Sequence, residues 1–283
     1  MSTPTPAVVV TGANSPTGRG LLPRLAKQDM RVTALVRTAQ DLPADEVIDD
    51  WTRSRRAVDA LANASVVVHL CGVFVATEWD SYEAGTVATT RRVVESVNPA
   101  ARLLYVSYVG ADPAHDNWYI KAKGQAEDLL RTVPDSVIFR IHALVGGREA
   151  PFPFELLFRQ TAADAPVRVF GDDTHRWRPI LLSDVLDALT NAVLGQGKAG
   201  TYDLVGPSEF AVADMPELIN GHRVPIERTP VRQAASVTGL PQTVVDLLAH
   251  PYPPSAPDAV AADFGLSLTR PETTWPLVHP SHA

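Results

Sequence analysis

Two side chains that can move a proton lie close together in the segment "NWYIKAKGQAE", residues 117–127. Tyr119 precedes Lys123 by four residues, so on a helix both side chains lie on one face. A free phenol has a pKa of about 10, too high for efficient proton exchange at neutral pH, and a nearby ammonium group lowers it by stabilising the phenolate. The pair therefore predicts an acid/base site that acts on a substrate oxygen. The alternative is a Tyr–Lys pair on a helix surface.

The chain around this pair alternates between short apolar runs and helical segments. Strands are predicted at 7–10, 31–37, 45–49, 65–72, 102–108 and 136–144, and helices at 21–27, 54–64, 84–97 and around Tyr119. Runs rich in β-branched residues, separated by helical periods, indicate parallel strands with helices on both faces. The predicted fold class is α/β: a Rossmann-type doubly wound parallel sheet with a smaller C-terminal substrate lobe.

The regular alternation ends near residue 145, where prolines and phenylalanines become frequent. We therefore expect residues 1–146 to form a nucleotide-binding domain. Residues 177–206 are expected to return to its sheet. Residues 147–176 and 207–283 are expected to form the substrate-binding lobe.

The turn in "VVVTGANSPTGRG" joins the first predicted strand to a helix. Gly12 and Gly18 flank this turn, where backbone N–H groups and the helix dipole can receive a pyrophosphate. The strict three-glycine spacing would place another glycine at Ser15. The next strand ends at Arg37, whose planar cation suits a 2′-phosphate, with Arg19 in support. NADP(H) is therefore favoured over NAD(H); the alternative is a solvated surface arginine.

Six segments in this order resemble the short-chain dehydrogenase/reductase superfamily, in its extended or atypical branch of NAD-dependent epimerase/dehydratase-like and NmrA-like proteins. They are "TGANSPTG", "DWTRSRRAVDAL", "VVVHLCG", "YVSYVGADP", "YIKAKGQAE" and "PILLSDVLDAL", and the resemblance covers most of residues 7–206. It implies that Tyr119 and Lys123 are the catalytic pair, and that Lys123 also reaches the nicotinamide ribose. It places Asp50 at the adenine, and Cys71 and Gly72 beside the diphosphate or the nicotinamide ribose.

The resemblance also implies a full set of cofactor contacts: Gly12, Asn14, Ser15, Thr17, Gly18, Arg19, Arg37, Asp50, Trp51, Leu70, Cys71, Gly72, Tyr119 and Lys123. The function expected from it is an NADP(H)-dependent oxidoreductase that transfers hydride to or from a carbonyl or alcohol of a small organic molecule. One alternative is a nucleotide-sugar epimerase or dehydratase that uses the cofactor transiently. Another is a non-catalytic NADP(H)-binding sensor protein.

The chain departs from the family pattern at the end of the strand 102–108. The family usually has a serine or threonine there that hydrogen-bonds the substrate oxygen, and the two positions read Ser107 and Tyr108. Successive side chains of a strand point to opposite faces. In the family the second of the two positions points inward, so the resemblance implies that Tyr108, not Ser107, faces the nicotinamide side, and we count both as candidate catalytic residues. Thr86 stands for a usual asparagine, and Arg140–Ile141 for a usual Arg-Pro.

Substrate contacts are harder to assign from sequence. His142, Phe152, Arg176 and Trp177 are candidates, and Phe154, His175 and Arg178 are close to them in the chain. The alternatives are core packing for the aromatic residues and His142, and a solvated turn for the segment "THRWRP". His69, at the end of "VVVHL", is expected to be structural.

The composition limits the class of protein. A net charge of −7 and a pI near 5.6 oppose nucleic-acid binding, which needs clustered Lys and Arg. Cys71 is the single cysteine, so an intrachain disulfide and a cysteine-built metal site are both excluded. The N-terminal segment has neither a basic region nor an apolar run long enough for a signal peptide or membrane span. We expect a cytoplasmic protein with a small-molecule substrate, without metal or membrane partners. A homodimer is the candidate assembly.

Overall fold

The computed structural model describes residues 5–147, 150–162, 164–171, 176–249 and 257–276. The chain divides into two compact units. The first comprises residues 1–140, 186–202 and 262–265, and the second comprises 141–185, 203–261 and 266–283. The segment 262–265 joins the first unit although nothing in its sequence indicated this.

The first unit is built on a seven-stranded sheet in the order β11-β6-β5-β4-β1-β2-β3. Its strands are β1 (Ala7–Thr11), β2 (Arg31–Leu35), β3 (Glu46–Ile48), β4 (Val66–His69), β5 (Arg102–Tyr108), β6 (Ser136–Ile141) and β11 (Gly200–Asp203). The pairings β1–β2, β1–β4, β2–β3 and β4–β5 are all parallel. This order, with its reversal beside β1, is that of a doubly wound sheet, so the predicted fold class is confirmed.

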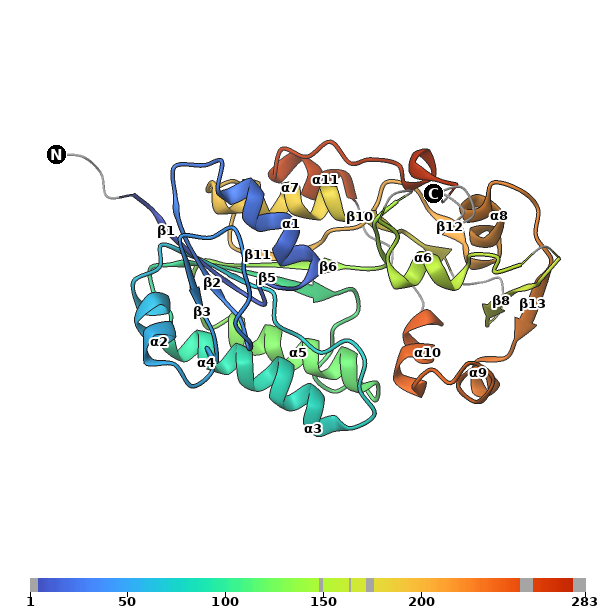
Figure 1. Ribbon diagram of the computed structural model, residues 1–283, viewed down its shortest axis with the longest axis horizontal. Coiled ribbons are helices and arrows are strands. Elements are labelled where there is room, and N and C mark those ends of the chain that lie inside the picture. The colour runs from blue at the N-terminus through green and yellow to red at the C-terminus, as the bar shows by residue number, and fades with distance from the viewer. Residues whose placement is uncertain (1–4, 148–149, 163, 172–175, 250–256, 277–283) are drawn as a thin grey trace. The chain divides into compact units, whose positions relative to one another are not determined.

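Helices cover both faces of this sheet. They are α1 (Pro16–Leu25), α2 (Arg55–Ala62), α3 (Trp79–Tyr82), a π-helical turn η1 (Glu83–Val87), α4 (Ala88–Ser96), α5 (Trp118–Leu130) and α7 (Leu182–Val193). Figure 1 shows α1 and α7 on one face, and α2, α4 and α5 on the other. The helix expected at 84–97 thus begins as a π turn and continues as α4.

Apolar side chains between the sheet and its helices form the core of the first unit. Val9, Leu35, Leu103 and Tyr105 from the strands pack there with Leu61 from α2, and all are at most 2% exposed. Burial of such a side chain stabilises a fold by about 1.5–3 kcal/mol. Because β4 is buried on both faces, its first three residues, Val66–Val68, are all apolar rather than alternating with polar residues.

The second unit contains short strands and helices around a separate aromatic core. Its elements are β7 (Leu144–Val145), α6 (Pro153–Leu157), β8 (Val167–Phe170), β9 (Arg176–Trp177), β10 (Ile180–Leu181), β12 (Phe210–Ala211), η2 (Val212–Asp214), α8 (Met215–Asn220), β13 (Ile226–Thr229), α9 (Val231–Thr238), α10 (Gln242–Leu248), α11 (Pro257–Asp263, which ends in the first unit) and η3 (Pro271–Thr274). Phe158, Trp177 and Trp275 lie in its core.

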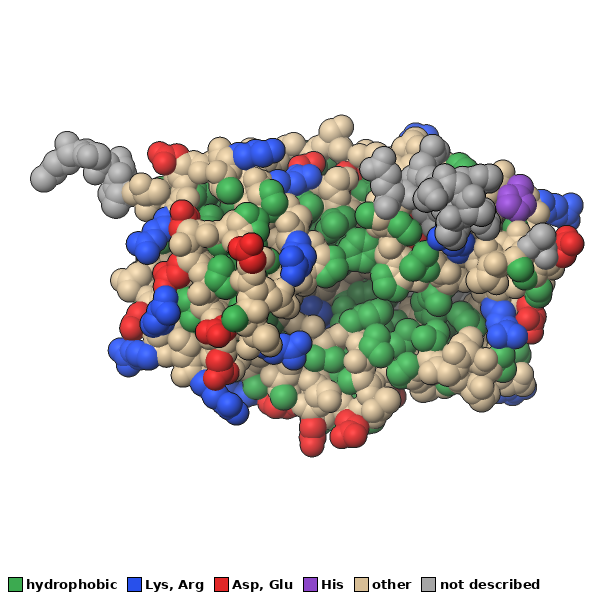
Figure 2. All heavy atoms as spheres, in the orientation of Figure 1, with side chains coloured by type: hydrophobic (Ala, Val, Ile, Leu, Met, Phe, Trp, Pro, Cys, Tyr) green, Lys and Arg blue, Asp and Glu red, His purple; other side chains and the backbone are tan. Residues whose placement is uncertain are grey.

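Charged side chains of both signs are mixed on the surface. Figure 2 shows Lys and Arg side chains interspersed with Asp and Glu side chains over the visible face of the first unit. That face therefore presents no continuous cationic surface of the kind that binds a phosphate backbone.

Candidate functional site

The glycine turn between β1 and α1 is built by backbone constraints. Gly12 has a φ of +62°, and a Cβ atom there would lie 2.9 Å from the carbonyl carbon of Leu70. A Cβ on Gly18 would lie 2.5 Å from the carbonyl oxygen of Ala13. Ser15, at the place of the middle glycine, has an ordinary φ of −67° and accepts a hydrogen bond from the Gly18 N–H as the N-cap of α1. A capping residue, and no glycine, is therefore what this position requires.

Arg37 follows the end of β2 and is exposed. Its carbonyl oxygen accepts a 3.3 Å hydrogen bond from the Asp50 N–H, so these two expected cofactor residues are neighbours. The positive charge of Arg37 also acts on the Cys71 thiol after β4. Arg19 donates to the carbonyl of Asn14 and to Gln40 Oε1, which fixes its guanidinium beside the glycine turn.

The other expected cofactor residues differ in exposure and in the element that holds them. Trp51 is 1% exposed and belongs to the apolar core, so the expectation that its side chain contacts the cofactor is wrong. Thr17 lies in the first turn of α1. β4 ends at His69, three residues earlier than predicted, so Leu70, Cys71 and Gly72 form the loop that follows it.

A chain of buried hydrogen bonds runs beneath this loop. Thr90 Oγ1 donates to the Thr86 carbonyl at 2.7 Å, so it accepts from His69 Nε2–H at 3.0 Å. His69 Nδ1 is then unprotonated and accepts from the Thr11 hydroxyl at 2.7 Å. Burial and the charge of Lys123 lower the pKa of His69 to about 3, which keeps the ring neutral. The structural role expected for His69 fits these contacts.

Tyr119 and Lys123 lie on one face of α5, which begins at the N-cap Asn117. Lys123 is 7% exposed, and its Nζ donates a 2.8 Å hydrogen bond to the carbonyl of Val106 in β5. The same nitrogen lies 4.6 Å from the ring centroid of Tyr105 and 5.8 Å from that of Tyr119. A Cβ on Gly72 would lie 3.2 Å from this nitrogen, so the loop after β4 and the lysine meet here.

The protonation of the pair differs from the expectation. Burial, and after it the phenols of Tyr108 and Tyr82, raise the pKa of Tyr119 above its ordinary value. This direction is opposite to the expected lowering, because the effect of burial outweighs any stabilisation of the phenolate by Lys123. Burial lowers the pKa of Lys123 to about 8, against the opposite effects of Glu127 and Cys71. At neutral pH the site therefore holds a neutral phenol and a largely charged lysine.

Ser107 and Tyr108, at the end of β5, have different partners on α5. The ring of Tyr108 lies edge to face against Tyr119, with 5.3 Å between centroids. Ser107 Oγ instead donates a 2.6 Å hydrogen bond to Glu127 Oε1. Tyr108, and not Ser107, therefore accompanies the Tyr119 ring.

Two aromatic residues that the sequence did not single out complete the surroundings of Tyr119. The half-exposed Phe74 is the second ring that packs edge to face against Tyr119, with 5.4 Å between the ring centroids. The Tyr82 hydroxyl donates to the carbonyls of Phe74 and Ala76 and accepts from the Ala76 N–H, which fastens this loop. The signal available in the sequence was an aromatic residue, Phe74, shortly after the apolar run 66–68.

The four candidate substrate residues belong to the second unit. Trp177 is 1% exposed and lies in the core, so the expectation of a pocket-lining Trp177 is wrong, and the half-buried Phe154 packs against it with 4.2 Å between ring centroids. His142 is 5% exposed and packs against Trp177, which favours the alternative of a core histidine.

The remaining residues of this group are nearer the surface. Arg176 is exposed and Phe152 is half-buried. Arg178 forms an ion pair with Glu209 at 3.2 Å. His175 lies outside the described residues.

The described residues contain neither a metal-binding cluster nor a membrane-spanning helix. No group of three or more His, Cys, Asp or Glu side chains is placed to hold a metal ion. No helix in the same part of the chain is long and apolar enough to cross a membrane.

A family model described as NAD(P)H-binding matches residues 12–140, which contain the glycine turn, Arg37 and the Tyr119–Lys123 pair. The chain carries an NAD(P)H-binding domain. No curated protein is similar enough in sequence to match the chain.

Solved structures match almost the whole chain in fold. The Bordetella bronchiseptica enzyme WbmH with NAD+ has a TM-score of 0.74 at 18% identity, over 95% of each chain. UDP-glucuronic acid 4-epimerase from Bacillus cereus with NAD has a TM-score of 0.64 at 18% identity, over 92% of this chain and 97% of that one. MoeE5 with UDP-glucuronic acid and NAD has a TM-score of 0.64 at 24% identity, over 92% and 98%. The expected likeness to NAD-dependent epimerases of the extended short-chain branch is confirmed in fold.

Proposed function

We propose that this protein is an NAD(P)-dependent enzyme that oxidises or reduces a carbon bearing a hydroxyl or carbonyl group in a small organic molecule. The observation that carries the proposal is that one unit holds both the glycine turn and the Tyr119–Lys123 pair, in which Lys123 is buried and Tyr119 is partly buried. Gly12, Gly18 and the first turn of α1 would hold the pyrophosphate, Arg37 a 2′-phosphate, and Lys123 the nicotinamide ribose. When bound, the nicotinamide accepts or supplies the hydride.

The work of the chain itself is proton transfer at the substrate oxygen. Tyr119 enters as a neutral phenol, because burial raises its pKa, and donates its proton as a carbonyl becomes a hydroxyl. In the reverse direction its oxygen takes the proton back. The ammonium group of Lys123 stabilises the phenolate left behind. The rings of Phe74 and Tyr108 restrict water at the phenol.

Two forms of this chemistry differ in the fate of the cofactor. The likeness to UDP-glucuronic acid 4-epimerase and MoeE5 favours an epimerase or dehydratase on a nucleotide sugar, in which the cofactor is regenerated. Arg37 favours NADP(H), and with it net reduction of a carbonyl. The structures of these neighbours contain NAD, and we give the epimerase form the greater weight on fold.

The test follows reduced nicotinamide by absorbance while UDP-sugars and a panel of simple carbonyl compounds are offered with each nucleotide. Product formation without net absorbance change supports the epimerase form, and stoichiometric change supports the reductase form. Tyr119→Phe should lower turnover by about 10²–10⁴-fold with nucleotide affinity kept. Tyr202→Phe removes a phenol whose hydroxyl only donates to the Lys198 carbonyl, and is the matched control. Near-normal turnover in Tyr119→Phe contradicts the proposal.

A non-catalytic NADP(H)-binding sensor is the second candidate. The contact that favours it is the hydrogen bond between Ser107 and Glu127, which removes the serine hydroxyl from the usual proton relay. Tight nucleotide binding without turnover on any compound, unchanged by Tyr119→Phe, would establish this alternative.

A further inference from the structure

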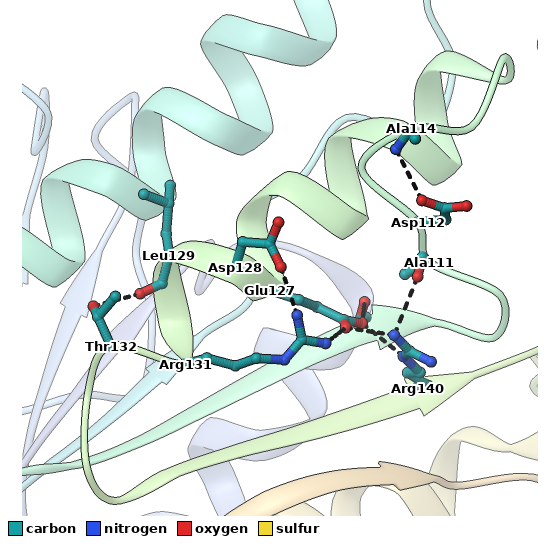
Figure 3. A network of polar contacts seen from close by, with 10 residues as sticks. Ala111, Asp112, Ala114, Glu127, Asp128, Leu129, Arg131, Thr132 and Arg140 are labelled. Atoms are coloured by element: carbon teal, nitrogen blue, oxygen red, sulfur yellow. Dashed lines mark hydrogen bonds and ion pairs between the residues drawn. The ribbon is translucent and has the colours of Figure 1, made fainter.

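Glu127 is a fully buried carboxylate one helical turn after Lys123 in α5. It accepts hydrogen bonds from Ser107 Oγ at 2.6 Å, from Arg140 Nε at 2.8 Å and Nη2 at 2.6 Å, and from Arg131 Nη2 at 2.7 Å. Figure 3 shows the carboxylate between the two guanidinium groups. A buried ion is costly unless it is paired and hydrogen-bonded, so these contacts hold Glu127 in its charged form at a defined place.

Three residues of α5, spaced four apart, meet three consecutive residues of β5. The contacts are Tyr119 with the ring of Tyr108, Lys123 with the carbonyl of Val106, and Glu127 with the hydroxyl of Ser107. The Glu127–Ser107 bond therefore contributes to the register between helix and strand. A shift of that register would move the Tyr108 ring away from Tyr119.

The groups around Lys123 come from several elements. They are His69 from β4, Cys71 and Gly72 from the loop after it, Thr86 from η1, Tyr105 from β5, and Tyr119 and Glu127 from α5. The His69 ring is neutral, and burial raises the pKa of the Cys71 thiol to about 11. The carboxylate of Glu127 is thus the anion among these groups at neutral pH.

We infer that Glu127 is a positioning residue of the Tyr119–Lys123 pair: its bond to Ser107 fixes the register that sets Tyr108 against Tyr119, and its charge keeps Lys123 an ammonium group. Arg140 and Arg131 hold the carboxylate in this place, and Arg140 Nη2 also donates to the Ala111 carbonyl at 3.1 Å. The consequence for turnover rests on the proposed function, whereas the consequence for the protonation of Lys123 does not.

The direct test is an NMR titration of lysine side-chain nitrogens. The chain has four lysines, Lys27, Lys121, Lys123 and Lys198, and a Lys123→Met sample assigns the signal of interest. In Glu127→Gln the midpoint of Lys123 should fall by about one pH unit or more, as expected for unit charges one helical turn apart. Asp128→Asn is the matched control, because Asp128 is the next residue, is exposed, and also pairs with Arg131. An unchanged Lys123 midpoint in Glu127→Gln overturns the inference.

Glu127→Gln leaves Arg140 without its carboxylate and Arg131 with Asp128 alone, so it can impair folding. Glu127→Gln with Arg140→Gln removes one of these cations and keeps a polar side chain at both positions. The Lys123 midpoint should fall in this variant also, and a midpoint equal to that of wild type overturns the inference. Glu127→Asp keeps the negative charge, so the Lys123 midpoint should return most of the way to its wild-type value.

Turnover gives the separate readout. If the proposed function holds, the alkaline limb of the pH–rate profile should move down with the Lys123 midpoint in Glu127→Gln and stay in place in Asp128→Asn. A profile that does not move overturns the catalytic part of the inference. A wild-type protein without turnover contradicts the proposed function, and the lysine titration still decides whether Glu127 sets the charge of Lys123.

Discussion

Replacing His69 by glutamine should make the free energy of unfolding less sensitive to acid. The buried His69 ring is neutral because one nitrogen donates to Thr90 and the other accepts from Thr11. Its pKa is lowered from 6.5 to about 3 by burial, with a smaller effect of Lys123. In the unfolded chain the same ring takes up a proton as the pH falls through about 6.5.

The sign follows from proton uptake. Between about pH 6.5 and pH 3 the unfolded state binds more protons at this position than the folded state, so stability falls as the pH falls. One pKa unit corresponds to about 1.4 kcal/mol, so at about pH 4 the wild-type protein should have lost about 3 kcal/mol through His69 alone. Glutamine does not titrate. His69→Gln is less stable at neutral pH, because one threonine hydroxyl loses its partner, and the difference from wild type should narrow in acid.

Urea unfolding of both proteins at neutral pH and at about pH 4, followed by circular dichroism, measures this narrowing. Carboxylates titrate in the same window, but they contribute equally to wild type and variant. His222→Gln, at an exposed ring, controls for the loss of one histidine and should run parallel to wild type. If the free energies of unfolding of wild type and His69→Gln fall equally between neutral pH and about pH 4, the conclusion that folded His69 is a neutral ring in this tautomer is refuted.

Three further predictions concern the cofactor, the relay and the second unit. Arg37→Ala should weaken NADPH binding by about 1.5–3 kcal/mol, the scale of a charge-assisted hydrogen bond, and leave NADH unchanged in calorimetry; equal losses for both nucleotides would contradict this. Tyr108→Ser should raise carbonyl reduction if the phenol obstructs the relay and lower it if the phenol takes part, and unchanged kinetics would exclude Tyr108 from the site. Glu155→Gln should cost about 3 kcal/mol of unfolding free energy, because the buried carboxylate accepts from three backbone N–H groups and Trp275 Nε1; a stable variant would refute this.

The order of the elements in the first unit was predictable from sequence because each depends on a local pattern. Residues 66–68 are all valine, which fits a strand buried on both faces. The turn at Gly12 could be located because its φ of +62° favours glycine, and α5 because Tyr119 and Lys123 share its face.

The features that sequence could not supply depend on contacts between distant residues. The partners of Glu127 come from β5, α5 and β6, and no local pattern connects Ser107 with Arg140. The pKa of Tyr119 depends on how deeply the phenol is buried, which spacing does not reveal. Trp177 was assigned to a pocket because aromatic residues serve pockets and cores alike, and only its burial distinguishes them.

Calorimetric titration of NADPH and NADH into the wild-type protein and into Gly12→Ala tests the central claim most directly. The account predicts that the wild type binds one dinucleotide per chain. It also predicts that Gly12→Ala binds much more weakly, because an alanine is strained at a φ of +62° and its Cβ would lie 2.9 Å from the Leu70 carbonyl carbon. Circular dichroism of the variant checks that the fold is kept. A wild-type protein that binds neither nucleotide, or a folded Gly12→Ala that binds as tightly as wild type, would contradict the assignment of the cofactor site to this turn.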